Sequence, residues 1–273
     1  TESFPRVAPF RDTLRRPDAT CDEPNASYLA AGHVEAKARF LQDLIRGLHA
    51  VSPTCLGAIF SYDLQNEFCY HGGPPFTLAS GTLEAANGTT YTLPGQRQEL
   101  ADDGAVYFLS RMVDAVHEVQ PHALVSASVF TYAAVGRTGP GDFSVKQAAW
   151  QNRIPFRPLA ILKSKVDFLD LHFYAADAQA WQRDLTSVEF EQVRNLTNQL
   201  GKPMIVGEFG AFKRPFPTVE PAAAWIGTWA AMFPQNGFAG WLFWTYDTHE
   251  QSDQIWHARD GQDAIYRALS QRK

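Results

Sequence analysis

The chain has 273 residues and a mass of 30.4 kDa, with 24 lysines and arginines against 29 aspartates and glutamates, so its formal net charge is −5. A mildly acidic chain without a basic cluster excludes nucleic acid as an expected partner. Hydrophobic residues make up 45% of the chain, enough to build a core, which excludes global disorder. No apolar run approaches the ~20 residues of a membrane span, so no membrane association is expected.

Strand-like apolar runs alternate with helical patterns along the chain, which predicts parallel βα units. Residues 1–32 are rich in proline and polar residues and predict a loop. After this loop, strands and helices follow in chain order. The expected strands are Leu56–Asn66, Leu124–Phe130, Val166–Tyr174, Met204–Phe209 and Gly240–Tyr246, and two long loops are expected over 68–97 and Thr131–Pro158. The expected helices are Gly32 to Pro53, Gln98–Val119, one between Thr186 and Gly201, one with Trp225 and Trp229, and Gln262–Ser270. Thr186 and Glu189 form a capping-box pattern at the start of the third of these helices.

The cysteine count is three: Cys21, Cys55 and Cys69. Cys55 and Cys69 flank a predicted strand, and an extended segment of that length holds two cysteines too far apart for a disulfide. Cys21 and Cys69 both lie in loop-like sequence. Two alternatives therefore remain, a disulfide between Cys21 and Cys69 or three reduced thiols.

Two carboxylates follow apolar runs near the ends of predicted strands. Glu67 ends the first predicted strand, and Glu208 lies near the end of the fourth. In parallel α/β folds the functional groups collect at the carboxyl ends of the strands, and burying a carboxylate is unfavourable unless it is compensated. The two glutamates are therefore candidate catalytic residues. The alternative is that each caps a following loop or pairs with an arginine.

The third predicted strand carries Asp170, His172 and Tyr174 at alternating positions, so the three side chains point to the same face. This polar triple indicates either a functional face or a hydrogen-bonded polar layer in the core. Trp244 lies near the end of the last predicted strand, where a tryptophan is either a platform for a sugar ring or a core residue.

These residues resemble, in order and spacing, the motifs of clan A glycoside hydrolases, above all the cellulase-like and mannanase-like enzymes of family 5. Asp63-Leu64-Gln65-Asn66-Glu67 resembles the Asn-Glu motif that ends strand 4 of that family. His172-Phe173-Tyr174 is similar to its strand 6 His-x-Tyr motif, and Gly207-Glu208-Phe209-Gly210 to its strand 7 nucleophile motif. Gly240-Trp241-Leu242-Phe243-Trp244 resembles strand 8 with its tryptophan.

The resemblance implies an α/β fold, a TIM (β/α)₈ barrel of which this chain covers roughly strands 4–8, with residues 1–273 as a single partial catalytic domain. It implies a retaining β-glycoside hydrolase that cleaves a β-linked glucan or mannan by double displacement. Glu67 is then the acid/base and Glu208 the nucleophile. Two such carboxyl groups need environments that separate their pKa values.

The resemblance also implies the substrate-binding residues. Asn66 would bond the sugar 2-hydroxyl, Tyr174 would orient Glu208, His172 would lie near the acid/base, and Trp244 would form the floor of the −1 subsite. The expected partner is a polysaccharide or oligosaccharide. No metal or cofactor is expected, and a polymeric substrate favours a secreted or periplasmic protein.

The sequence departs from the family pattern in two places. Phe68 stands where the family usually has proline after the acid/base. Strands 1–3 have no counterpart in residues 1–55, so we expect a fragment whose missing barrel strands come from an absent N-terminal segment. This departure keeps an alternative open, namely a non-catalytic carbohydrate-binding barrel or a truncated inactive fragment.

Overall fold

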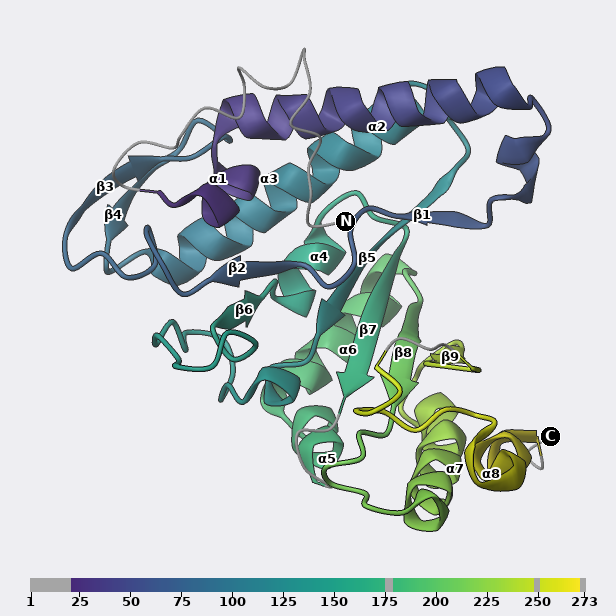
Figure 1. Ribbon diagram of the computed structural model, residues 1–273. Helices are drawn as coiled ribbons and strands as arrows, with labels where there is room; N and C mark the ends of the chain where they lie inside the picture. Colours follow the sequence, from purple (N-terminus) through teal and green to yellow (C-terminus); the bar gives the residue numbers. More distant parts are fainter. Residues whose placement is uncertain (1–20, 175–178, 248–250, 271–273) are drawn as a thin grey trace. The chain divides into compact units, whose positions relative to one another are not determined.

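The computed structural model describes residues 21–174, 179–247 and 251–270, and Figure 1 shows its helices and strands. The chain divides into two compact units, which are described separately. The first unit comprises residues 1–129 and 140–169, and the second comprises residues 130–139 and 170–273.

The main sheet has five strands in the order β1-β5-β7-β8-β9. These strands are β1 (Ser61–Asp63), β5 (Leu124–Phe130), β7 (Phe168–Tyr174), β8 (Met204–Gly210) and β9 (Trp241–Phe243). β1 pairs with β5 in parallel, and β8 pairs with β9 in parallel. β5 and β7 are nearly continuous buried runs, as expected for strands covered on both faces. The predicted α/β fold is confirmed, and each of its five expected strands is present.

The first unit packs its helices around an aromatic core. Its helices are α1 (Glu23–Leu29), α2 (Ala31–Val51), the short 3-10 helix η2 (Cys55–Ala58), α3 (Arg97–His117) and α4 (Pro158–Lys163). The long helices α2 and α3 pack against each other, as Figure 1 shows. Tyr28 of α1 makes edge contacts with Phe68, Phe108 and Phe156, all of them buried. Phe68, the residue that follows Glu67, belongs to this core.

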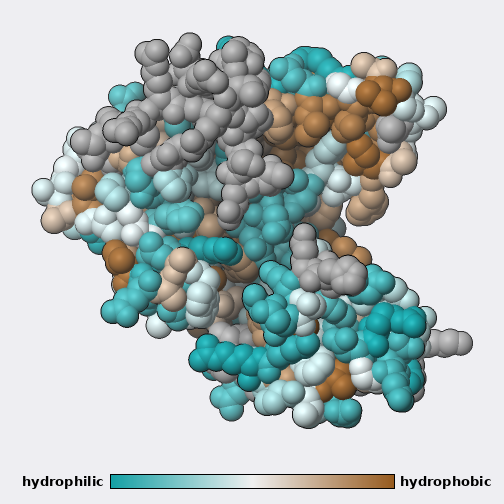
Figure 2. All heavy atoms as spheres, in the orientation of Figure 1, coloured by the Kyte–Doolittle hydropathy of each residue, from teal (hydrophilic) through white to brown (hydrophobic). Residues whose placement is uncertain are grey.

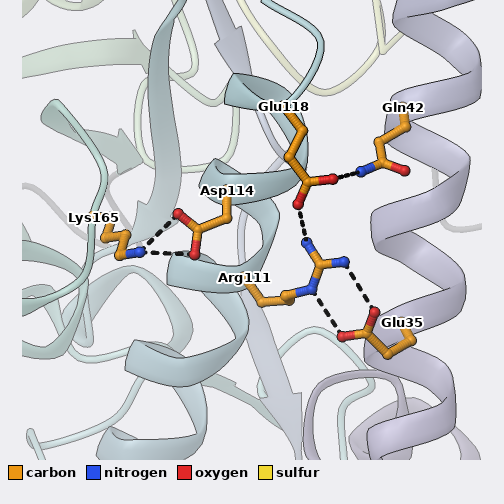
Figure 3. A network of polar contacts seen from close by, with 6 residues as sticks. All are labelled: Glu35, Gln42, Arg111, Asp114, Glu118 and Lys165. Carbon is orange, nitrogen blue, oxygen red and sulfur yellow. Dashed lines mark hydrogen bonds and ion pairs between the residues drawn. The ribbon is translucent and has the colours of Figure 1, made fainter. Parts of the chain in front are cut away.

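Polar contacts also join the helices of the first unit (Figure 3). Arg111 of α3 donates two hydrogen bonds to Glu35 of α2, at 2.8 and 3.0 Å. Glu118 accepts a hydrogen bond from Gln42 of α2 at 2.5 Å. Lys165, two residues past α4, contacts both carboxylate oxygens of Asp114 at 2.7 Å. α3 is thereby fixed to α2 on one side and to the segment after α4 on the other.

The second unit surrounds its strands with η3 (Ala133–Val135), α5 (Ala180–Leu185), α6 (Val188–Leu200), α7 (Val219–Gln235) and α8 (Asp260–Ser270). Trp181 of α5 is fully buried and lies 5.7 Å from Phe233 of α7 between ring centroids. Phe233 in turn lies 5.1 Å from Phe209 of β8. α5, α7 and β8 therefore share one aromatic core.

Several elements differ from the sequence prediction. The region 1–32, expected to be a loop, contains α1 (Glu23–Leu29). Its N-cap is Asp22, whose carboxylate accepts a hydrogen bond from the Asn25 amide. The first strand shortens to Ser61–Asp63 because residues 55–58 form η2. The two expected long loops contain short antiparallel pairs: β2 (Cys69–His71) with β6 (Arg153–Pro155), and β3 (Gly81–Glu84) with β4 (Thr90–Leu93). Pairs this short carry too few residues to show an alternating pattern.

The helix α6 corrects one detail of the capping prediction. Ser187, and not Thr186, accepts the hydrogen bond from the Phe190 amide, while the Thr186 hydroxyl donates to the Gln182 carbonyl of α5. The C-terminal end is as predicted, because Gly201 adopts a left-handed φ of 64°.

The structure tests the alternative of a disulfide between Cys21 and Cys69, while the Cys55 side chain lies outside what it describes. No disulfide joins Cys21 and Cys69, whose side chains are reduced and buried. In the described part of the chain, no helix combines the length and the apolar character that crossing a membrane requires.

Candidate active site

Asn66 and Glu67 lie in the first unit, in the turn that leaves β1. The Glu67 amide donates to the hydroxyl of Ser128 on β5 at 3.0 Å, and the Phe68 amide donates to the Ser128 carbonyl at 2.9 Å. The same hydroxyl lies 2.7 Å from Asp63 Oδ2, at the end of β1. Ser128 is fully buried, so one fixed side chain holds both ends of the turn on β5.

Glu67 itself has a left-handed backbone, with a φ of 58°. A non-glycine residue in this region is strained, and such strain persists only where the surroundings fix the backbone. The hydrogen bonds to Ser128 supply that restraint. The Glu67 carboxylate is half-buried, and its Oε2 lies 3.8 Å from Nη1 of Arg153 on β6. Asn66 is exposed at the surface of the first unit.

Gln65, in the same turn, contacts residues of the helices α1 and α2. Gln65 donates to the Tyr28 hydroxyl at 2.6 Å and accepts from Lys37 Nζ at 3.2 Å. The Lys37 ammonium also lies 4.5 Å from the centre of the Tyr28 ring. Burial lowers the pKa of Lys37 to about 8. The side chain next to Asn66 is therefore anchored to two helices of the first unit.

His172, Tyr174 and Glu208 come together in the second unit. The hydroxyl of Tyr174 donates a 2.7 Å hydrogen bond to Glu208 Oε2. His172 Nδ1 lies 3.4 Å from the same oxygen, and the histidine side chain is 3% exposed. The shared face predicted for β7 is confirmed by these contacts. Glu208 sits within β8, near its end, and 20% of its side chain is exposed.

Asp170, the third member of the polar triple, faces β8 as well. Its Oδ1 accepts from the Gly207 amide at 2.7 Å and lies 3.8 Å from His172 Nε2. Burial raises the pKa of Asp170, while His172 and the Gly207 amide act in the opposite direction. Hydrogen bonds to a carboxylate and a nearby histidine both favour its charged form.

Trp244 lies just past the end of β9, beside the last residues of β8. Its amide donates to the Phe209 carbonyl at 2.9 Å, and its side chain is half-buried. A Cβ on Gly210 would meet the Trp244 carbonyl, so glycine at 210 permits this close approach. The backbone of Trp244 is thus fixed to the strand that carries Glu208.

Of the six residues singled out in the sequence, the structure brings His172, Tyr174 and Glu208 into contact and fixes Trp244 to the same strand. Asn66 and Glu67 belong to the first unit, and their pairing with Glu208 stays a prediction. Sequence reasoning missed Arg153 and Lys37. Arg153 falls in a segment expected to be a loop, and Lys37 belongs to a helix with no chemical motif, so neither carried a signal.

Solved structures with a similar fold are found, but no match is found among protein-family models or curated proteins. Among solved structures, an endo-β-1,4-mannanase from Thermotoga petrophila is similar with a TM-score of 0.54 and 14% identity, over 89% of this chain and 51% of that one. An endo-1,4-β-D-mannanase from Thermotoga petrophila RKU-1 is similar with a TM-score of 0.52 and 14% identity, over 87% of this chain and 64% of that one.

An exo-β-1,4-mannosidase from Opitutaceae bacterium strain TAV5 is similar with a TM-score of 0.52 and 16% identity, over 93% of this chain and 42% of that one. This chain therefore spans less than two thirds of each of these three proteins. At such identities the likeness shows the fold alone. The chain has a fold like that of clan A glycoside hydrolases, corresponding to part of a (β/α)₈ barrel.

Proposed function

We propose that this chain carries the catalytic residues of a retaining β-glycoside hydrolase that acts on a β-linked mannan or glucan. The observation that carries the proposal is the contact of Glu208 with Tyr174 and His172 near the end of β8. Carboxylates at the carboxyl ends of strands are the usual catalytic groups of this fold. The mannanases and the mannosidase with similar folds favour a β-mannoside as the first substrate to test.

In this proposal Glu208 is the nucleophile. The Tyr174 hydroxyl donates to one carboxylate oxygen, which orients the group. Glu208 then attacks the anomeric carbon of the sugar in the −1 subsite and forms a covalent glycosyl-enzyme. Trp244 is proposed as the floor of that subsite.

Glu67 is proposed as the acid/base. It protonates the leaving oxygen in the first step and removes a proton from water in the second step. A retaining mechanism needs the two carboxyl groups about 5–5.5 Å apart, so the proposal requires the two units to form one catalytic domain. Asn66, the residue before Glu67, would then form a hydrogen bond with the 2-hydroxyl of the sugar in the −1 subsite.

The test is hydrolysis of β-1,4-manno- and gluco-oligosaccharides by the chain and by Glu208→Gln and Glu67→Gln. Each variant is expected to lose about 10³-fold or more in kcat, because it removes the nucleophile or the acid/base. Glu191→Gln, an exposed glutamate on α6, is the matched control and should leave kcat unchanged. NMR of the first product formed should show the β-anomer.

Azide separates the two roles. With Glu67→Ala and an aryl β-glycoside whose leaving group departs without protonation, azide should restore turnover and give a β-glycosyl azide, because the covalent intermediate still forms. With Glu208→Ala, it should give an α-glycosyl azide by direct displacement. An inverted first product, or full activity in either glutamine variant, would contradict the proposed mechanism.

The alternative is a carbohydrate-binding barrel without turnover. Calorimetric titration with mannohexaose decides between the two: binding without hydrolysis supports the binding barrel. Secretion stays a prediction, which follows only from a polymeric substrate.

A further inference from the structure

Asp170 is a buried carboxylate that the proposed mechanism does not use. Its residue is 8% exposed and lies on β7, on the face that also carries His172 and Tyr174. A carboxylate in such a place requires compensation by hydrogen bonds or charge. Its two described partners, the Gly207 amide and the His172 ring, both lie next to Glu208. Asp170 is therefore linked to the nucleophile through these two groups and not by direct contact.

The first partner is the backbone immediately before the nucleophile. Asp170 Oδ1 accepts from the Gly207 amide at 2.7 Å. A Cβ at position 207 would overlap the Asp170 carboxylate, so only glycine lets the carboxylate approach this closely. The hydrogen bond therefore joins β7 to β8 one residue before Glu208, and it limits how the Glu208 side chain leaves the strand.

The second partner is the imidazole that lies against the nucleophile. Asp170 Oδ1 is 3.8 Å from His172 Nε2, while His172 Nδ1 is 3.4 Å from Glu208 Oε2. The ring thus lies between two carboxylates, one at each nitrogen, with its side chain 3% exposed. A carboxylate beside one ring nitrogen favours the tautomer that carries the proton on that nitrogen.

We propose that Asp170 is a positioning residue for the nucleophile, acting through the Gly207 amide and the His172 ring. The inference rests on the proposed function, because it assigns Asp170 to the reaction in which Glu208 attacks. Among the described residues of the second unit, the charged and titratable groups that face this cluster include Glu208 on β8 and Tyr174 on β7. Glu67 joins them in the proposed catalytic domain.

The principal variant is Asp170→Asn, whose amide oxygen still accepts from Gly207 while the charge opposite His172 is removed. With Glu208 less well oriented, kcat should fall by about 10- to 100-fold while KM changes by less than about threefold. The matched control is Asp167→Asn. Asp167, directly before β7, accepts from the Val125 amide at 2.8 Å and lies in the first unit. This control should leave kcat unchanged.

A second variant disturbs the same contact from the other strand. Gly207→Ala displaces the Asp170 carboxylate with a methyl group but replaces no charged residue. It should reproduce the loss in kcat. Thermal unfolding of both variants distinguishes a positioning effect in a folded chain from loss of the fold. If Asp170→Asn and Gly207→Ala are folded and keep wild-type kcat, the inference is overturned.

An NMR measurement separates failure of this inference from failure of the proposed function. The ring ¹⁵N resonances of His172, assigned by comparison with His172→Gln, should shift in Asp170→Asn and stay in place in Asp167→Asn. This readout needs no turnover. A shift without any hydrolysis supports the Asp170–His172 link and contradicts the proposed function, whereas unshifted resonances contradict the link itself.

Discussion

At the scale of single residues, burial decides which acidic groups have unusual chemistry. Asp184 of α5 accepts a hydrogen bond from the Ala133 amide at 3.3 Å, and its buried Oδ2 has no hydrogen-bond partner among the residues that the structure describes. Burial raises the pKa of Asp184 from its ordinary value of 3.8 to about 6, against the lowering effect of Thr131 and the Ala133 amide. The charge is therefore unfavourable in the folded chain at neutral pH.

This pKa predicts a pH dependence of stability. Because the folded-state pKa lies above the unfolded value, the stabilisation is present below about pH 4 and is lost as the pH rises through about 6. Asp184→Asn cannot ionise. Relative to this variant, the wild type should lose up to about 3 kcal/mol in free energy of unfolding between pH 4 and pH 7.

Urea unfolding at a series of pH values measures the difference. Asp43→Asn is the control, because the Asp43 side chain is 62% exposed and should give a profile parallel to the wild type. Parallel profiles for Asp184→Asn and the wild type would show that ionisation of Asp184 does not oppose folding.

At the scale of elements, close packing between helices depends on where a side chain is absent. Gly104 of α3 faces Leu29 of α1, and the Tyr70 hydroxyl lies beside it, donating to the Ala101 carbonyl at 2.9 Å. Leu29 is 2% exposed and Tyr70 is 1% exposed, so neither has room to move. Gly47 of α2 has open space around the position of a Cβ.

The two glycines therefore predict opposite effects of the same substitution. Gly104→Ala should lower the free energy of unfolding by about 1–3 kcal/mol, because the methyl group overpacks the contact between α1 and α3. Gly47→Ala should raise it by about 0.5–1 kcal/mol, because alanine favours the helix and meets nothing. Denaturant unfolding of both variants checks the pair. A stabilised Gly104→Ala would show that the contact is looser than it appears.

At the scale of the whole molecule, exposed apolar side chains gather beside the terminal strand of the sheet. β1 ends the strand order among the described residues, and Phe60 directly before it is 79% exposed. Val51 at the end of α2 is 86% exposed, and Leu44 of the same helix is 45% exposed. Figure 2 shows hydrophobic atoms along this part of the first unit, at the top right. Edge strands with apolar surroundings favour association.

We expect the chain to self-associate in a concentration-dependent way, and Phe60→Lys and Val51→Lys to reduce that association. Both side chains are exposed, so each variant should change the free energy of unfolding by less than about 0.5 kcal/mol. Sedimentation velocity over a range of concentrations measures the effect. Val188→Lys, at a 71% exposed valine of α6 in the second unit, is the control and should associate like the wild type.

The sequence by itself determined the order of the main-sheet strands and of the long helices, and it placed three polar side chains on one face of β7. Long segments with clear periodicity were predicted well, such as the strand 124–130 and the helix around Val106 and Val116. The alternation of Asp170, His172 and Tyr174 placed three side chains on one face, because successive residues of a strand point to opposite sides. Local geometry suffices for such predictions.

Tertiary structure alone decided what these side chains touch. The Gly207 amide meets Asp170, and Ser128 holds the Glu67 turn, across strands that are distant in sequence. The short pair β2 and β6, which brings Arg153 toward Glu67, has no pattern long enough to read in the sequence. The pKa of Asp184 likewise depends on burial by the segments around it. Periodicity specifies a face, whereas partners, burial and charge arise only when separate segments pack together.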